Sequence, residues 1–194
     1  MKTVLKNITS IQAGYSFRAR LESMENGSLA VIQMKDLTSA NLVCCDELVR
    51  VDIEMPKAHH LVKPGDLIFR SRGLTSNSAL LTSDPGDAVL AAPLLRIRIT
   101  SKQVLPEYLN WYISQPPAQS YLASCTEGTA LKMISKQSLE NLEVFVPSIA
   151  RQQLVVEMAS LAVEEQRILK TLSEKRNQYI SSRLLQLAQG GRNG

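Results

Sequence analysis

Residues 142–147, Leu-Glu-Val-Phe-Val-Pro, are followed by residues 148–189, which begin SIARQQLVVEM and contain no proline and no glycine. The first stretch has the apolar and aromatic residues of a short strand. The second carries apolar side chains at intervals of three, four or seven residues, the spacing of one face of a helix. The pattern predicts a strand-rich domain over residues 1–147, one long helix over residues 148–189 and a flexible tail over residues 190–194.

The predicted helix has an apolar stripe that the rest of the chain is too small to cover. At roughly 1.5 Å per residue the helix extends about 55 to 60 Å, which exceeds the width of a small domain. We therefore expect a second helix to cover the stripe, and we predict a homodimer. The residues expected at the dimer interface are Leu154, Met158, Leu161, Ile168, Leu172 and Tyr179.

The domain before the helix is predicted to be α/β (α+β-like), with a mixed or antiparallel twisted sheet and short helices. Its strand-like segments follow one another without regular helical crossovers, which argues against a doubly wound parallel sheet. A Lys-Pro-Gly-Asp turn is expected at residues 63–66, before a strand that would place Arg70 and Arg72 on one face. The expected strands cover residues 29–34, 42–51, 67–73, 88–92 and 94–100, and the expected helices residues 106–113 and 118–124.

Composition narrows the classes of function. The chain has 194 residues, of which 44% are hydrophobic, so a real core is expected. It has no apolar run long enough to cross a membrane and no secretory leader pattern, so we expect a cytoplasmic protein without membrane contact. Residues 1–148 carry 15 Lys and Arg against 14 Asp and Glu, and the remainder carries 7 against 4. Any contact with nucleic acid must therefore come from local basic clusters.

No catalytic or cofactor motif is present. The sequence lacks GxGxxG, GxxxxGK[ST], GxSxG and HExxH patterns. Its two histidines, His59 and His60, are adjacent and would point to opposite faces of a strand, which makes a poor metal or acid–base pair. The three cysteines have no metal-site spacing and are expected to pack in a reducing compartment. The sequence thus predicts no enzyme, no cofactor and no metal site.

Polar loops combine cations with side chains that are able to meet base edges. Arg and Lys suit phosphate contacts, whereas Asn, Thr and aromatic side chains suit base contacts. Solvated loops of other proteins have a similar composition, so that alternative stays open. The candidate DNA-binding residues are Tyr15, Phe17, Arg18, Arg20, Lys35, Arg70, Arg72, Asn77, Thr129 and Lys132.

The order of these segments resembles the specificity subunit of type I restriction-modification systems. The resemblance covers essentially the whole chain. At residues 148–152 the sequence SIARQ departs from the second proline and Glu-Gln pair that the family commonly has. The matching segments are Gly14 with its polar loop, VIQMKDL at 31–37, LVKPGDLIF at 61–69, PEYL at 106–109, residues 128–147, and Gln152-Gln153.

The resemblance implies a target recognition domain that reads half of a bipartite DNA site, followed by a spacer helix that acts as a ruler. Full-length members are similar to two such units in tandem with antiparallel spacer helices. One unit here suggests a half-subunit that dimerises on an interrupted palindrome. Methyl transfer, and cleavage where it occurs, would belong to separate modification and restriction subunits.

Two alternatives stay open. One is a DNA-recognition module of another phage-defence or fused methyltransferase system. The other is a coiled-coil adaptor that does not bind DNA, and it would show no salt-sensitive DNA binding.

Overall fold

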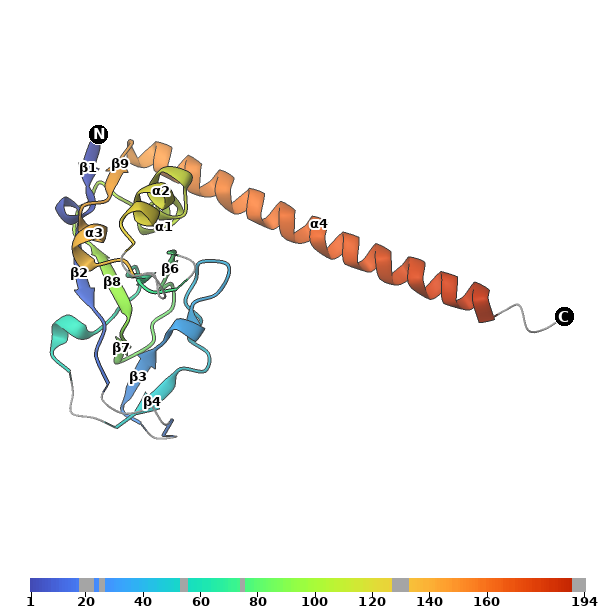
Figure 1. The fold of residues 1–194 in the computed structure, drawn as a ribbon, viewed down its shortest axis with the longest axis horizontal. Helices are drawn as coiled ribbons and strands as arrows, with labels where there is room; N and C mark the ends of the chain where they lie inside the picture. The colour runs from blue at the N-terminus through green and yellow to red at the C-terminus, as the bar shows by residue number, and fades with distance from the viewer. Residues whose placement is uncertain (18–22, 25–26, 53–55, 74–75, 127–132, 190–194) are drawn as a thin grey trace. The chain divides into compact units, whose positions relative to one another are not determined.

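The computed structural model describes residues 1–17, 23–24, 27–52, 56–73, 76–126 and 133–189 (Figure 1). The chain divides into two compact units, Met1–Gln153 and Leu154–Gly194. The first unit contains the sheets and short helices, and the second consists of the remainder of the long helix. The predicted fold class, mixed and antiparallel sheets followed by one long helix, is confirmed.

The described residues of the first unit form three small sheets (Figure 1). A four-stranded antiparallel sheet has the order β2 (Thr9–Ala13), β8 (Leu94–Ile99), β5 (Leu67–Arg70) and β6 (Ser78–Leu80). A three-stranded sheet has the order β4 (Val49–Val51), β3 (Leu29–Ile32) and β7 (Ala88–Leu90). In it β3 is antiparallel to β4 and parallel to β7. The third sheet pairs β1 (Lys2–Val4) with β9 (Glu143–Phe145).

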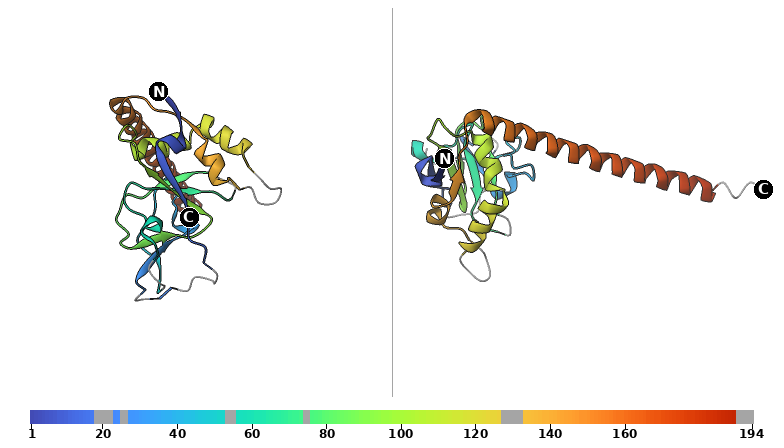
Figure 2. Two further views of the ribbon diagram at one scale, coloured as in Figure 1. Left: turned by 90° about the vertical axis from the view of Figure 1, so that its left-hand side faces the viewer. Right: turned by 90° about the horizontal axis from the view of Figure 1, so that it is seen from above.

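The short helices begin where the sequence supplies a start signal. Pro106 opens α1 (Pro106–Ile113) and Pro116 opens α2 (Pro116–Ser124), because proline is tolerated in the first helical turn. Helix α2 therefore starts two residues before the predicted one. In Figure 2 (right) these two helices lie along one side of the sheets, and α1 contacts β6. The Ser135 hydroxyl caps α3 (Lys136–Glu140) by accepting a hydrogen bond from the Ser138 N–H.

Strand β3 is buried on both faces, which explains its uninterrupted apolar sequence, Leu-Ala-Val-Ile. Ala30 and Ile32 belong to a core cluster that includes Ile68 of β5. Leu29 and Val31 belong to a second cluster on the other face of the three-stranded sheet. The strand therefore joins two small cores and fixes the chain that leaves it at Gln33.

All five predicted strands are shorter than expected, and two of them differ most. Of residues 42–51 only Val49–Val51 form a strand, because Asn41 has a φ of 58° and the chain next to it makes only isolated bridges. The strand expected over residues 67–73 ends at Arg70. Arg72 makes an isolated bridge with Met133. The regular alternation expected to place both arginines on one face therefore does not extend to Arg72.

The predicted turn before β5 is confirmed, and it leads into a buried ion pair. Pro64 and Gly65 occupy the middle of the turn, and Gly65 adopts a φ of 89°, which suits glycine. Asp66 is 1% exposed and receives two hydrogen bonds from the Arg98 guanidinium, at 2.7 and 2.6 Å. This bidentate contact raises the pKa of Arg98.

Helix α4 (Ile149–Gln189) is tied to the first unit through Gln152, whose side chain is fully buried. Its Oε1 accepts a hydrogen bond from the Leu105 N–H at 2.9 Å. Its Nε2 donates to the Gln103 carbonyl at 2.7 Å and to the Pro147 carbonyl at 2.9 Å. One amide thus satisfies three backbone groups from two distant segments.

We predict that Gln152→Ala lowers the free energy of unfolding of the first unit by about 2–4 kcal/mol, because it leaves a cavity and three unpaired backbone groups. Chemical denaturation followed by circular dichroism measures the change. The matched control is Gln153→Ala, since Gln153 is exposed and its loss is expected to change the free energy by no more than about 0.5 kcal/mol. Equal effects of the two substitutions would contradict this role of Gln152.

Candidate nucleic-acid interface

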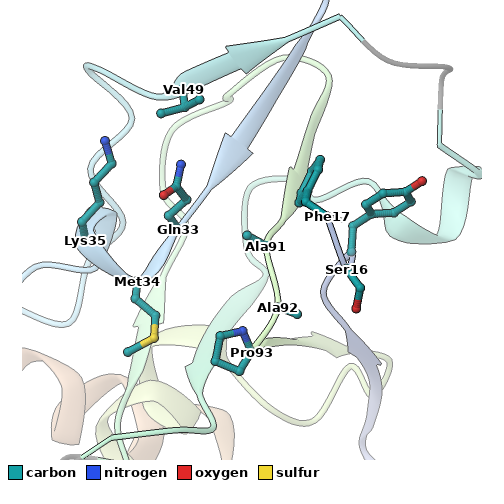
Figure 3. A pocket seen from close by; sticks show the side chains of 10 residues that line it. Ser16, Phe17, Gln33, Met34, Lys35, Val49, Ala91, Ala92 and Pro93 are labelled. Carbon is teal, nitrogen blue, oxygen red and sulfur yellow. The ribbon is translucent and has the colours of Figure 1, made fainter. Parts of the chain in front are cut away.

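An open hollow of about 650 Å³ lies where three segments of the first unit meet (Figure 3). In Figure 3, Gln33, Met34 and Lys35 lie on one side and Ser16 and Phe17 on the other, with Ala91, Ala92 and Pro93 between them. Tyr15 and Val49 complete the lining. The hollow therefore combines aromatic rings, an amide, a hydroxyl and an ammonium group in one concave surface.

Backbone hydrogen bonds lock the three segments together. The Tyr15 N–H donates to the Leu90 carbonyl at 2.6 Å, and the Ala92 N–H donates to the Tyr15 carbonyl at 2.9 Å. The Ala91 N–H donates to the Ile32 carbonyl at 2.9 Å. Because the ties are between backbones, the positions of the walls do not depend on flexible side chains.

Gly14 allows the first wall to approach the strands so closely. A Cβ atom at this position would lie 2.8 Å from the Leu90 carbonyl oxygen and 2.9 Å from the Leu94 carbonyl oxygen. Both contacts are to backbone, which cannot move aside cheaply. Gly14 therefore has a steric role: without a side chain, it lets the segment that carries Tyr15 and Phe17 lie close to the strands.

The aromatic wall is part of a larger ring cluster. The ring centroids of Tyr15 and Phe17 lie 5.0 Å apart, and the Phe17 side chain packs on the second core cluster. The His60 ring meets Tyr15 edge-on at 5.9 Å and lies 4.2 Å from the His59 ring. The two histidines occupy a 3₁₀ turn, η3 (Ala58–His60), and their rings lie side by side, because the chain there is not a strand.

The η3 turn is held from below by arginines of β8. Arg96 donates from one nitrogen to the His59 carbonyl at 2.7 Å and to the Leu61 carbonyl at 2.9 Å. Arg98 also donates to the Leu61 carbonyl, at 3.0 Å. Burial lowers the pKa of His60, and the neighbouring His59, Arg96 and Lys57 lower it further. The ring beside Tyr15 therefore loses its proton more readily than a free histidine does.

The polar wall is the 3₁₀ turn η2 (Met34–Asp36), which also has buried supports. The Asp36 carboxylate accepts a hydrogen bond from the Gln33 N–H at 2.7 Å. Burial raises the pKa of Asp36, against the opposing effects of that hydrogen bond and of Lys35. The Arg70 guanidinium donates to the carbonyls of Met34 at 3.1 Å and Leu37 at 3.4 Å. Lys35 therefore stands exposed on a turn that is fixed at both ends.

The structure brings together only some of the predicted DNA-binding residues. Tyr15, Phe17 and Lys35 line the hollow. Arg72 is exposed but does not line the hollow; the preceding residue, Ser71, donates a hydrogen bond to the carbonyl of Pro93, which does line it. Arg18, Arg20, Thr129 and Lys132 lie outside the described residues.

Arg70 and Asn77 are half-buried, and their side chains donate hydrogen bonds to neighbouring segments of the chain. Arg70 supports η2 as described, and Asn77 donates to the Asn41 side chain at 2.9 Å. Asn41 in turn donates to the Ser114 hydroxyl of the α1 C-terminus at 3.3 Å, and its carbonyl accepts from Asn110 at 3.0 Å. The Asn77 amide thus helps to join the loop before Val43 to helix α1, and Asn77 does not line the hollow.

Sequence reasoning missed Ser16 and Gln33 as lining residues. Ser16 lies between the two aromatic residues already singled out. Gln33 is the first polar residue after the fully buried strand β3, at the point where the chain turns into η2. A polar residue directly after a strand that is buried on both faces can indicate a surface site, because the chain reaches the surface where such a strand ends.

The predicted dimer residues all lie on the exposed surface of α4. Their exposed fractions run from 53% at Ile168 to 71% at Met158. Leu169, Ile180, Leu184 and Leu185 of the same helix are also exposed. Within the part of the chain that the structure describes, no segment covers this apolar surface.

No helix of the described residues has the length and apolarity needed to span a membrane. Among those same residues, no cluster of three or more His, Cys, Asp or Glu side chains could hold a metal ion. Cys44 is exposed, whereas Cys45 packs partly against the first core. The expectation of ordinary packing therefore does not hold for Cys44, because the short bridges at residues 42–43 leave the next residue at the surface.

Comparison with solved structures identifies the fold. The chain matches the S subunit of a type I restriction-modification system from M. genitalium with a TM-score of 0.58 and 11% identity, over 96% of this chain and 45% of that one. It matches the HsdS subunit from Thermoanaerobacter tengcongensis with a TM-score of 0.65 and 17% identity, over 88% and 39%. The chain has the fold of type I S subunits.

A third structure, solved to describe complex assembly and conformational transition of the type I R-M system, matches with a TM-score of 0.72 and 16% identity. The match covers 96% of this chain and 44% of that one. This chain thus spans less than half the length of each of the three matched chains. No protein-family model and no curated protein matches the sequence.

Proposed function

We propose that this chain recognises a DNA sequence as a half specificity subunit of a type I restriction-modification complex. The observation that carries the proposal is the fold, which matches two S subunits with TM-scores of 0.58 and 0.65 over 96% and 88% of this chain. In this proposal the chain itself is not an enzyme. Methyltransferase subunits, and a restriction subunit where cleavage occurs, act on double-stranded DNA in the cytoplasm once this chain has bound.

The hollow and its rim have the chemistry that DNA recognition requires. Lys35 and Arg72 are exposed cations that suit phosphate oxygens, whereas Gln33, Ser16 and Tyr15 offer donors and acceptors for bases. Discrimination between bases needs side chains held within a fraction of an ångström. The backbone ties and the arginine supports described above provide that rigidity.

We predict that Lys35→Ala and Arg72→Ala each weaken binding to duplex DNA and reduce the slope of log affinity against log salt by about one, because each removes one phosphate contact. Fluorescence anisotropy between about 50 and 200 mM salt measures the slope. The matched control is Arg70→Ala, which removes a cation that the structure uses internally. It is expected to lower thermal stability and leave the salt slope unchanged.

Unchanged slopes for Lys35→Ala and Arg72→Ala would remove the hollow from the DNA-facing surface. Absence of any salt-sensitive DNA binding by the full chain would favour the adaptor function instead. A changed slope for Arg70→Ala, with the fold intact, would restore Arg70 to the DNA-binding set.

We further propose that α4 pairs with the α4 of a second copy in antiparallel orientation. Between Leu154 and Tyr179 the heptad positions that form the seam are apolar except for two, Glu165 and Lys175, which are exposed in the single chain. In a parallel, in-register pair each of these charges would face its own copy. In an antiparallel pair centred on Lys170, Glu165 faces the second copy's Lys175, so charge complementarity favours this arrangement.

The same register matches the apolar residues. Ile168 faces the second copy's Leu172, and Leu161 faces the second copy's Tyr179. Leu169, which is 57% exposed and lies beside the seam, meets its own copy near the two-fold axis. In this register the same helix–helix contact buries the apolar stripe and pairs Glu165 with Lys175.

We predict that Glu165→Lys and Lys175→Glu each raise the dissociation constant of the dimer about tenfold, because each converts two attractive pairs into repulsive ones. The double variant is expected to restore the dimer. Sedimentation equilibrium measures the constant, and Lys170→Glu is the matched control because Lys170 faces away from the seam. A double variant as weak as the single ones would exclude this register, and a monomeric wild type would show that another helix covers α4.

The antiparallel pair also sets the spacing of the DNA half-sites. Removing residues 166–172 deletes one heptad and keeps the remaining seam in phase, and it shortens each helix by about 10 Å at roughly 1.5 Å per residue. Since base pairs are stacked at about 3.4 Å, the preferred gap of a palindromic site is expected to shrink by about 3 base pairs with the half-sites unchanged. Methylome sequencing of cells with the cognate methyltransferase measures the gap. A continuous or an asymmetric site would overturn the two-fold model.

A further inference from the structure

We propose that the hollow between Phe17 and Gln33 receives one nucleobase extruded from the bound DNA duplex. This proposal rests on the proposed DNA-binding function and names what occupies its site. The geometry that motivates it is the concavity of the surface. Base pairs within an intact duplex are read by side chains that project into a groove, so a hollow can only receive a part of the DNA that projects outward.

The chemistry of the walls matches a single base. Tyr15 and Phe17 line the hollow, and aromatic rings are side chains on which a base is able to stack. The Gln33 amide lies on the opposite side, where it would meet the hydrogen-bonding edge of the base (Figure 3). The Lys35 ammonium is exposed beside it and suits the phosphate that enters with the nucleotide.

The hollow is already formed without a ligand. Its floor is made of the small residues Ala91 and Ala92, and its volume of about 650 Å³ falls within the range of pockets for small organic ligands. The backbone hydrogen bonds at Tyr15 and the arginine supports under η2 and η3 hold the two walls in place. An extruded base would therefore enter a preformed site and would not need to order one.

The test begins with the full chain and a random pool of duplex DNA, from which a bound sequence is selected. Each base pair of that sequence is then replaced in turn by a mismatch, which lowers the cost of extruding a base. We expect one position in each half-site at which the mismatch strengthens binding about tenfold. 2-Aminopurine placed at that position should report an unstacked base in the complex.

Variants of the hollow then locate the extruded base. Phe17→Leu keeps the apolar packing but removes the ring, and Ala92→Phe fills the floor from an exposed position. Both are expected to reduce the tenfold preference to nearly none. The preference is a ratio of two affinities, so a general loss of DNA affinity cancels from it. The matched control is Phe145→Ala, which removes an exposed aromatic ring of β9 that does not line the hollow.

Three results would overturn the inference. One is binding of paired DNA with no position at which a mismatch strengthens it. Another is a mismatch preference that survives both Phe17→Leu and Ala92→Phe. The third is saturable binding of free dAMP or dTMP at the hollow without any mismatch preference in duplexes, which would assign it to a free nucleotide. Failure of the proposed function is distinct, since then no duplex would bind in a salt-sensitive manner.

Discussion

The buried amide of Gln152 is the interaction on which the organisation of this chain depends. A fully buried amide is stable only if its donors and acceptor are paired, and here its partners are backbone groups of Gln103, Leu105 and Pro147. The start of α1 and the end of β9 are thereby joined to the first turn of α4. Beyond this turn the described residues of α4 are almost all exposed, so they do not belong to the core.

The same need to satisfy buried polar groups divides the arginines into two kinds. Arg70, Arg96 and Arg98 donate to backbone carbonyls or to Asp66, and so they hold the η2 and η3 turns in place. Among the described residues, Lys35 and Arg72 are exposed cations without such acceptors.

The proposed roles of the two units follow from different physical terms. The first unit offers a rigid hollow whose walls are tied by backbone hydrogen bonds, which suits discrimination between bases. The second offers an apolar stripe interrupted by Glu165 and Lys175, and charges within a seam choose orientation and register more than they add affinity. Recognition and spacing can therefore be altered separately, by substitutions in the hollow and by heptads removed from α4.

The sequence alone determined the features that depend on local backbone preferences. These are helix α1 at Pro106, the turn at Pro64 and Gly65, the junction before α4, and the exposed stripe, because periodicity and allowed φ values are written in neighbouring residues. Only the tertiary structure decided that Arg70 and Asn77 face inward and that Gln33 joins Tyr15, Phe17 and Lys35. Their partners lie tens of residues away, and whether a polar side chain is buried depends on acceptors that only the folded chain brings within reach.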